Sequence, residues 1–150
     1  MKQLIYSMRF IGRATPVAGS NGVMKATTRA PSCRLTTVAG ANGIEGSFDN
    51  VAGEASRFES EVTITGETSF REAGTISFGE RGGHDLTFST VGQGYLADSV
   101  QAGLKHGTVT WRVDSGAGQF AGASGLITSN FTISEAGEVT DHHFGLIFVK

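Results

Sequence analysis

The segment from Gly107 to Lys150 constrains the fold of this chain more than any other part of the sequence. Apolar and polar residues alternate along it in three stretches, separated by a glycine-rich corner around Phe120 and a short turn at residues 135–138. Alternation with a period of two is typical of β-strands, because successive side chains of a strand point to opposite faces. The segment therefore predicts three strands, over residues 105–114, 126–134 and 139–149.

Earlier parts of the chain show the same alternation. Residues 57–65 are the clearest case, since apolar side chains and Ser60 fall on one face and charged side chains on the other. Residues 98–104 form the only predicted helical turn, with Asp98 as its N-cap. Further strands are predicted over residues 2–12, 23–29, 33–38, 68–78 and 85–91.

About eight strands with frequent turn signals are typical of a β-sandwich or a β-barrel. We favour the barrel over the sandwich, because a closed sheet exposes no edge strand. This chain has few charges or prolines that could protect an exposed edge. The sequence predicts an all-β single domain over residues 1–150, a closed eight-stranded antiparallel barrel with at most one short helix. Glycine-rich corners are expected where strands bend, above all at Gly116, Gly118, Gly122 and Gly125.

Composition limits the partners of such a domain. The chain has 22 glycines among 150 residues but only two prolines, which favours turns and bulges in a packed sheet over disorder. Its net charge of −2 predicts no binding to nucleic acid or to an anionic membrane. No stretch approaches the roughly 20 apolar residues of a membrane span, and residues 1–16 lack the apolar core of a signal peptide. With Cys33 as the single cysteine, we expect no disulfide and a cytoplasmic location.

The strand GTVTWRV followed by GAGQFAGASG, together residues 107–113 and 116–125, resembles the strand, glycine and phenylalanine signature of the allene oxide cyclase-like barrel proteins. The resemblance implies a compact eight-stranded antiparallel barrel, often dimeric or trimeric, with a lumen for an apolar ligand. The plant namesake opens and cyclises a fatty-acid-derived epoxide. No catalytic residue of that enzyme aligns with this sequence, so the resemblance implies no residue roles.

The last predicted strand carries the best candidates for acid–base chemistry. Alternation places His142 and Phe144 on one face, and Asp141 and His143 on the other. If the first face lines the lumen, His142 stands at the end of an apolar wall as a general acid or base. If the second face does, the Asp141 carboxylate can orient or charge the His143 imidazole. A third interpretation is a polar strand end that merely meets solvent.

Other side chains are candidates for the lumen wall or the strand exterior. Trp111 is a core residue or a platform for a flat ligand, whereas Arg112 faces solvent or, inside a barrel, clamps an anion or oxygen. Tyr6 and Tyr95 are the only phenols, and either could donate a proton at a barrel mouth. No spacing of histidines completes a metal site. The predicted catalytic residues are His142, His143, Asp141 and Tyr6, and the predicted ligand-binding residues are Trp111, Arg112, Phe144, Phe10, Met8 and Tyr95.

These observations predict a cofactor-independent isomerase or lyase that opens or cyclises a small oxygenated lipophilic molecule, such as a terpenoid or fatty-acid epoxide. A first alternative is a non-catalytic barrel that binds a hydrophobic metabolite. A second is a structural protein with a solid barrel, filled by Phe10, Phe58, Phe70, Phe88, Trp111, Phe144 and Phe148. Residues 144–149 are apolar on both faces, so we also expect a homo-oligomer.

Overall fold

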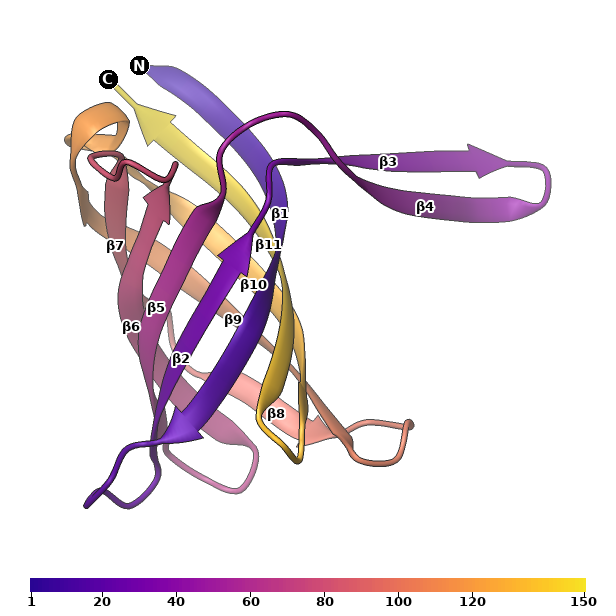
Figure 1. The fold of residues 1–150 in the computed structure, drawn as a ribbon, viewed down its shortest axis with the longest axis vertical. Coiled ribbons are helices and arrows are strands. Elements are labelled where there is room, and N and C mark those ends of the chain that lie inside the picture. The colour runs from indigo at the N-terminus through magenta and orange to yellow at the C-terminus, as the bar shows by residue number, and fades with distance from the viewer.

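The computed structural model describes residues 1–150, which form a closed eight-stranded antiparallel barrel with one long hairpin projecting from it (Figure 1). The predicted all-β fold class is confirmed, and the only helix is a single 3-10 turn. The elements are β1 (Lys2–Pro16), β2 (Val23–Ala30), β3 (Cys33–Gly40), β4 (Gly43–Asn50), β5 (Ser56–Ile64), β6 (Ser69–Phe78), β7 (Asp85–Thr90), β8 (Gly94–Asp98), β9 (Leu104–Gly116), η1 (Gly118–Phe120), β10 (Ser124–Ser134) and β11 (Glu138–Val149).

The barrel is closed by the first and last strands. Around its circumference the order is β1, β2, β5, β6, β7, β9, β10 and β11, and β11 pairs with β1 from Lys2 opposite Val149 to Arg13 opposite Glu138. The short β8 pairs with β6 and β9 beyond the end of β7, so β7 and β8 together fill one position. Both chain termini therefore lie at the same end of the barrel, and β8 lies at the other (Figure 1).

The predicted helical turn over residues 98–104 is wrong. Asp98 ends β8, and its carboxylate accepts a hydrogen bond from Lys105 across the hairpin, at 2.7 Å, in place of capping a helix. The backbone N–H of Ser99 donates to the Leu104 carbonyl, which closes a tight strand-to-strand turn. Two observed strands, β4 and β8, were not among the predicted ones, because glycine and polar residues obscure their alternation.

Aromatic side chains fill the barrel from its middle to the end that carries the termini. Phe10, Phe58, Phe88 and Trp111 form what we call the aromatic layer. Phe58 lies at its centre, with its ring 5.3 Å from that of Phe88 and 5.4 Å from that of Trp111. Of the seven aromatic residues predicted to fill the interior, five do so, and each is at most 2% exposed. Phe144 and Phe148 were wrongly included, since they lie on the outer face and are 51% and 37% exposed.

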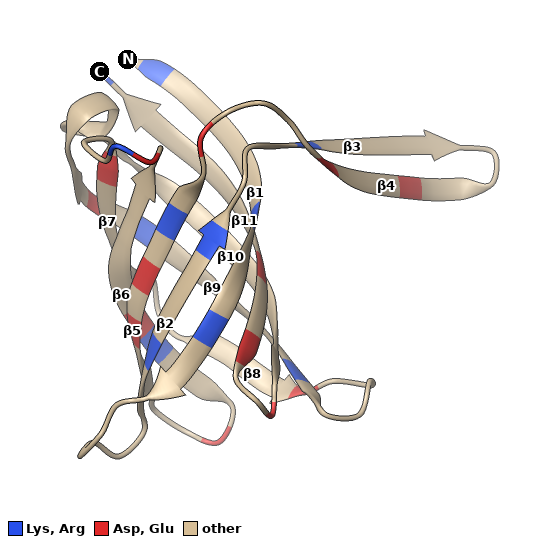
Figure 2. Cartoon of the chain, in the orientation of Figure 1, with Lys and Arg blue, Asp and Glu red and all other residues tan.

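The charged residues are interspersed along the strands. Figure 2 shows Lys and Arg alternating with Asp and Glu over the visible side of the barrel, with no large area of one sign. No helix in the structure has the length and apolar character that crossing a membrane requires.

The predicted glycine corner closes the barrel end that carries the termini. Phe120, at the end of η1, is 2% exposed and packs with its ring 5.1 Å from that of Phe78. Gly116 makes room for it, because a Cβ at this position would fall 2.6 Å from the Cβ of Phe120. Gly118 has a φ of +61°, a conformation that residues with a Cβ rarely adopt. The corner thus folds a phenylalanine plug into the barrel end.

Removal of this plug is expected to destabilise the fold. Truncation of a buried phenylalanine costs about 3–5 kcal/mol, so Phe120→Ala should lower the free energy of unfolding in urea by that amount. The neighbouring Gln119 is exposed, and Gln119→Ala is the matched control, with an expected change within about 0.5 kcal/mol. Equal, small effects of the two substitutions would contradict the plug.

Candidate functional site

A cavity of about 70 Å³ lies inside the barrel, with Phe58 of the aromatic layer on one side and Met24, Leu96 and Ile133, near β8, on the other. Its wall is apolar except for three inward-facing side chains, which belong to Thr28, Glu72 and Asp141. A buried water needs roughly 10–15 Å³ measured in this way, and a typical ligand pocket has about 300 Å³ or more. The cavity therefore has room for the reacting end of a small molecule and not for a whole drug-sized ligand.

The cavity continues outwards into a larger groove. Met24, Leu96 and Ile133 line both spaces and so form the apolar mouth between them. The groove has a volume of about 590 Å³ and runs beside the turn between β8 and β9, with Ser134 and Glu135 on its other side. A ligand too long for the cavity could place its remaining atoms there.

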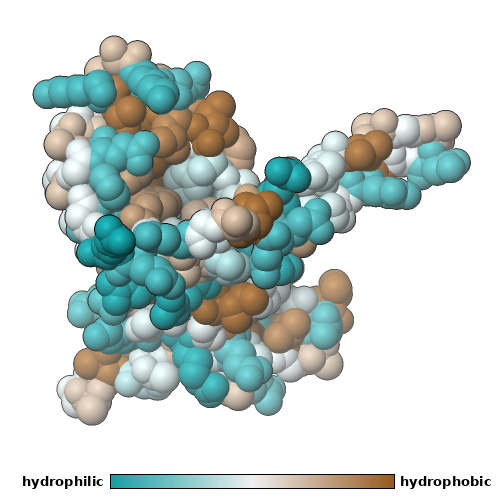
Figure 3. Space-filling model, turned by 45° about the horizontal axis from the view of Figure 1, so that its top comes forward, coloured by the Kyte–Doolittle hydropathy of each residue, from teal (hydrophilic) through white to brown (hydrophobic).

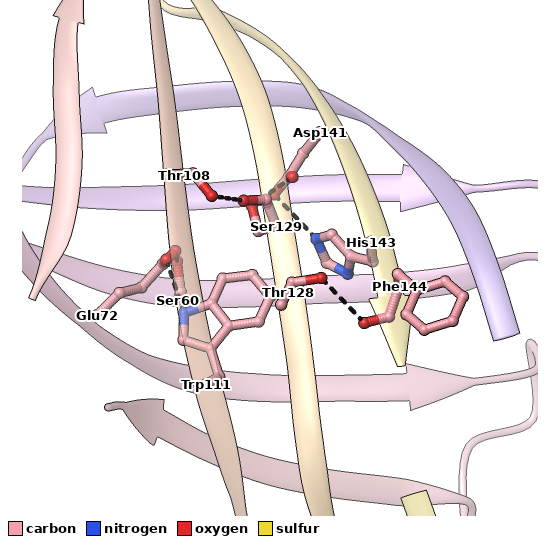
Figure 4. A network of polar contacts seen from close by, with 9 residues as sticks. All are labelled: Ser60, Glu72, Thr108, Trp111, Thr128, Ser129, Asp141, His143 and Phe144. Atoms are coloured by element: carbon pink, nitrogen blue, oxygen red, sulfur yellow. Dashed lines mark hydrogen bonds and ion pairs between the residues drawn. The ribbon is translucent and has the colours of Figure 1, made fainter. Parts of the chain in front are cut away.

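Glu72 is one of two carboxyl groups on the cavity wall. Its backbone N–H and C=O both hydrogen-bond the hydroxyl of Thr90, at 2.7 and 2.8 Å, which fixes the strand at this point. The carboxyl group accepts hydrogen bonds from the Ser60 hydroxyl, at 2.5 Å, and from the Trp111 indole N–H, at 3.1 Å (Figure 4). Burial raises the pKa of Glu72 to about 8, because it outweighs the lowering effect of these donors, and the nearby Asp141 raises the pKa further. Glu72 is thus mostly protonated at neutral pH.

Asp141 is the second carboxyl group, and its surroundings differ. One oxygen accepts a hydrogen bond from the Ser129 hydroxyl at 2.5 Å, and the other lies 2.9 Å from Nε2 of His143 (Figure 4). Both oxygens of Asp141 are therefore engaged. Glu72 and Asp141 thus place two carboxyl groups with different surroundings on one small apolar space, and such differences separate acid and base roles in enzymes.

His143 lies behind Asp141, inside the aromatic layer. Its ring stacks on Phe10, with centroids 4.3 Å apart, and meets the edges of Phe58 and Trp111 at 5.2 and 5.0 Å. The ring is 1% exposed and Nδ1 has no hydrogen-bond partner. Since His143 is not on the cavity wall, we assign it a positioning role: it holds the Asp141 carboxylate, and the aromatic rings hold it.

Six of the predicted site residues lie inside the barrel. Asp141, His143, Phe10 and Trp111 surround or support the cavity, as described above, while Tyr6 and Met8 lie nearer the closed end. The Tyr6 ring packs against Phe78, and its hydroxyl is buried without a partner. Burial, with a contribution from the charge of Asp141, raises the pKa of Tyr6 far above its ordinary value. The phenol stays protonated there and does not reach the cavity wall.

The other four predicted site residues lie on the outer surface. Because β11 turns Asp141 and His143 inwards, alternation puts His142 and Phe144 outside, and both are exposed. Arg112 also faces outwards, where its guanidinium pairs with Asp114 at 3.0 Å, and Tyr95 is 50% exposed. Their assignment to the lumen is wrong for one reason, the phase of strand alternation.

Sequence reasoning missed Glu72 and the two serines, Ser60 and Ser129, that hydrogen-bond the carboxyl groups. A signal was present, since Glu72 stands on the face of β6 that also carries Phe70 and Ile76, and an acid on an apolar strand face is unusual. Ser60 on β5 and Ser129 on β10 gave no comparable signal, because serine is frequent on either face.

No group of three or more histidine, cysteine, aspartate or glutamate side chains is placed so that it could hold a metal ion. Comparisons of the chain with protein-family models, with curated proteins and with solved structures found no match. The resemblance of residues 107–125 to the allene oxide cyclase-like barrels therefore remains a prediction.

The raised pKa of Glu72 predicts how stability depends on pH. In the unfolded chain this carboxyl group ionises near its ordinary pKa of 4.5, while in the folded protein it keeps its proton up to about pH 8. Between these values the unfolded state binds fewer protons, so stability should fall as pH rises, by up to about 1.4 kcal/mol per pH unit.

The experiment compares urea unfolding of the wild type and Glu72→Gln at pH 5, 6, 7 and 8. The glutamine keeps the shape of the side chain and cannot ionise, so its stability should fall less over this range. Parallel pH profiles of the two proteins would show that Glu72 ionises in the folded protein as readily as in the unfolded chain.

Proposed function

We propose that this barrel is a cofactor-independent isomerase or lyase that opens or cyclises a small oxygenated lipophilic molecule by acid–base catalysis in the lumen. The observation that carries the proposal is the pair of carboxyl groups on one apolar cavity, of which Glu72 is neutral and Asp141 accepts hydrogen bonds on both oxygens. Epoxides of terpenoid or fatty-acid type are the favoured substrates, because their strained ring needs only a proton on oxygen to open.

In the proposed reaction Glu72 gives its proton to the epoxide oxygen as one C–O bond breaks. The Asp141 carboxylate then takes a proton, either from the carbon next to the electron-poor centre, which leaves an alkene, or from a substrate hydroxyl that attacks that centre, which closes a ring. The proton gained by Asp141 returns to Glu72 to complete the cycle. Substrate and product have the same composition, and the positioned acid contributes about 10²–10⁴-fold.

The geometry of the two spaces supports this substrate class. The cavity takes the epoxide end, the mouth of Met24, Leu96 and Ile133 holds the apolar chain, and the outer groove takes the rest. We also propose that the enzyme is a homo-oligomer, because large apolar side chains crowd the outer face of β11 as well as its inner face.

The apolar wall of the cavity also fits one alternative, a barrel that binds a hydrophobic metabolite without changing it. In that case the buried carboxyl groups would serve only to hydrogen-bond an oxygen atom of the ligand. The alternative differs from the enzyme in one outcome: the ligand is recovered unaltered and in stoichiometric amount.

The proposal is tested by incubating the protein with a panel of terpenoid and fatty-acid epoxides and analysing the products by gas chromatography and mass spectrometry. We expect a product with the mass of the substrate from at least one epoxide. Glu72→Gln and Asp141→Asn should each lower turnover by about 100-fold or more, because each removes a proton donor or acceptor.

Glu59→Gln is the matched control, since Glu59 is an exposed glutamate on the outer face of β5, and it should retain full turnover. Turnover by both lumen variants at the wild-type rate would reject the assigned roles. Binding of an epoxide without any conversion would favour the metabolite-binding alternative.

A further inference from the structure

The hairpin of β3 and β4, here called the arm, projects from the end of the barrel that carries the termini (Figure 1). It forms a separate two-stranded sheet, and almost all of its residues are exposed. Each strand has 8 residues, so the arm is about 26 Å long at roughly 3.3 Å per residue. A two-stranded hairpin alone is at best marginally stable in water, and a partner surface would stabilise the arm.

The two faces of the arm differ in chemistry. Its register pairs Leu35 with Phe48 and Ala39 with Ile44 on one face, with Thr37 opposite Gly46 between them, and we call this mainly apolar face the apolar arm face. The opposite face is mainly polar, and it carries Arg34 paired with Asp49, Thr36 with Ser47 and Val38 with Glu45. Alternation of this kind is typical of a sheet with one covered face.

Only the root of the apolar arm face is covered in a single chain. There the Phe48 ring lies 5.4 Å from that of His142, with the Arg9 guanidinium 5.2 Å from its centre, and the Cys33 thiol donates to the Ser7 carbonyl at 3.3 Å. Nothing covers the rest of this face: Leu35, opposite Phe48, is 45% exposed, and Ile44, near the tip, is 74% exposed. Figure 3 shows the arm standing clear of the barrel, with apolar side chains at its surface.

A second apolar surface lies on the barrel next to the root of the arm. Ile5 on β1 and Leu126 on β10 are both paired with Leu146 on β11, so three neighbouring strands carry a row of large apolar side chains on the outer face. Phe144 and Phe148 flank Leu146 on the same face. This outer patch consists of Ile5, Leu126, Phe144, Leu146 and Phe148, and all but Leu146 are at least 37% exposed. Such a contiguous exposed patch marks an interaction surface.

We propose that the partner of both surfaces is a second copy of this chain, with the apolar face of each arm resting on the outer patch of the other copy. One face of the arm, about 26 Å by about 10 Å, offers only about 260 Å² from strand dimensions, whereas a stable complex buries about 800 Å² on each partner. The area buried by a single arm contact is therefore too small for a stable complex. The reciprocal contact of a two-fold dimer doubles the buried area and also brings the barrel faces together.

The arm and the patch adjoin on one chain, since Ser7 at the arm root is paired with Phe144 of the patch. This closeness is what a self-complementary interface requires. This contact is the interface of the proposed homo-oligomer, whatever the chemistry of the lumen.

The test is the molar mass of the purified protein, measured by size-exclusion chromatography with light scattering over a range of concentrations. We expect the wild type to have twice the 15.7 kDa mass of one chain. Ile44→Glu on the apolar arm face and Leu126→Glu in the patch should each weaken the dimer at least about 100-fold, because each would bury an unpaired charge.

Matched controls separate the interface from general effects of added charge. Thr36→Glu adds the same charge to an exposed residue on the other arm face, opposite Ser47, and Asn130→Glu changes an exposed residue further along the outer face of β10. Both should remain dimeric, and circular dichroism should show unchanged folding of all four variants. A monomeric wild type would overturn both the homo-oligomer and the arm contact. A wild-type oligomer that Ile44→Glu and Leu126→Glu leave intact would overturn the arm contact alone.

Discussion

Two acidic side chains lie inside one small apolar barrel, and their burial determines how the interior around them is built. A buried carboxyl group is tolerated only if it is hydrogen-bonded or neutral, and each of the two satisfies this condition differently. Glu72 keeps its proton and receives hydrogen bonds from Ser60 and Trp111. Asp141 is held by Ser129 and His143, and the ring of His143 is in turn packed among aromatic side chains. The aromatic layer thus both fills the barrel and holds the ring of His143 against Asp141.

The two ends of the barrel have different tasks. Phe120 and the glycine corner close one end, and the cavity leads out through the other, between Met24, Leu96 and Ile133. The arm leaves the barrel at the closed end (Figure 1). The dimer that we propose would therefore leave the mouth of the cavity free, so assembly and access to the lumen do not compete for the same surface.

The fold could be predicted from the sequence because strand alternation and glycine corners are local signals. The same alternation showed that Asp141 and His143 share a face of the last strand. It could not show which face points inwards, because both carry large apolar side chains. Which face of β11 points into the barrel depends on residues of other strands. The Tyr6 ring, for example, occupies the space at Gly145, where a Cβ would fall 2.1 Å from a carbon of that ring. Glu72 was missed for a similar reason, since Trp111, which binds it, lies on another strand 39 residues away.

Acid–base chemistry in the lumen requires that Glu72 be neutral at physiological pH, and the carboxyl carbon of Glu72 reports its protonation state directly. A ¹³C NMR titration of protein labelled at glutamate carboxyl carbons, with Glu72→Gln to assign the signal, measures the pKa of Glu72 in the folded state. The structure predicts one glutamate that titrates near pH 8 and is missing from the variant. Titration of every glutamate near the ordinary pKa of about 4.3 would contradict a neutral Glu72, because the cavity would then lack its proton donor.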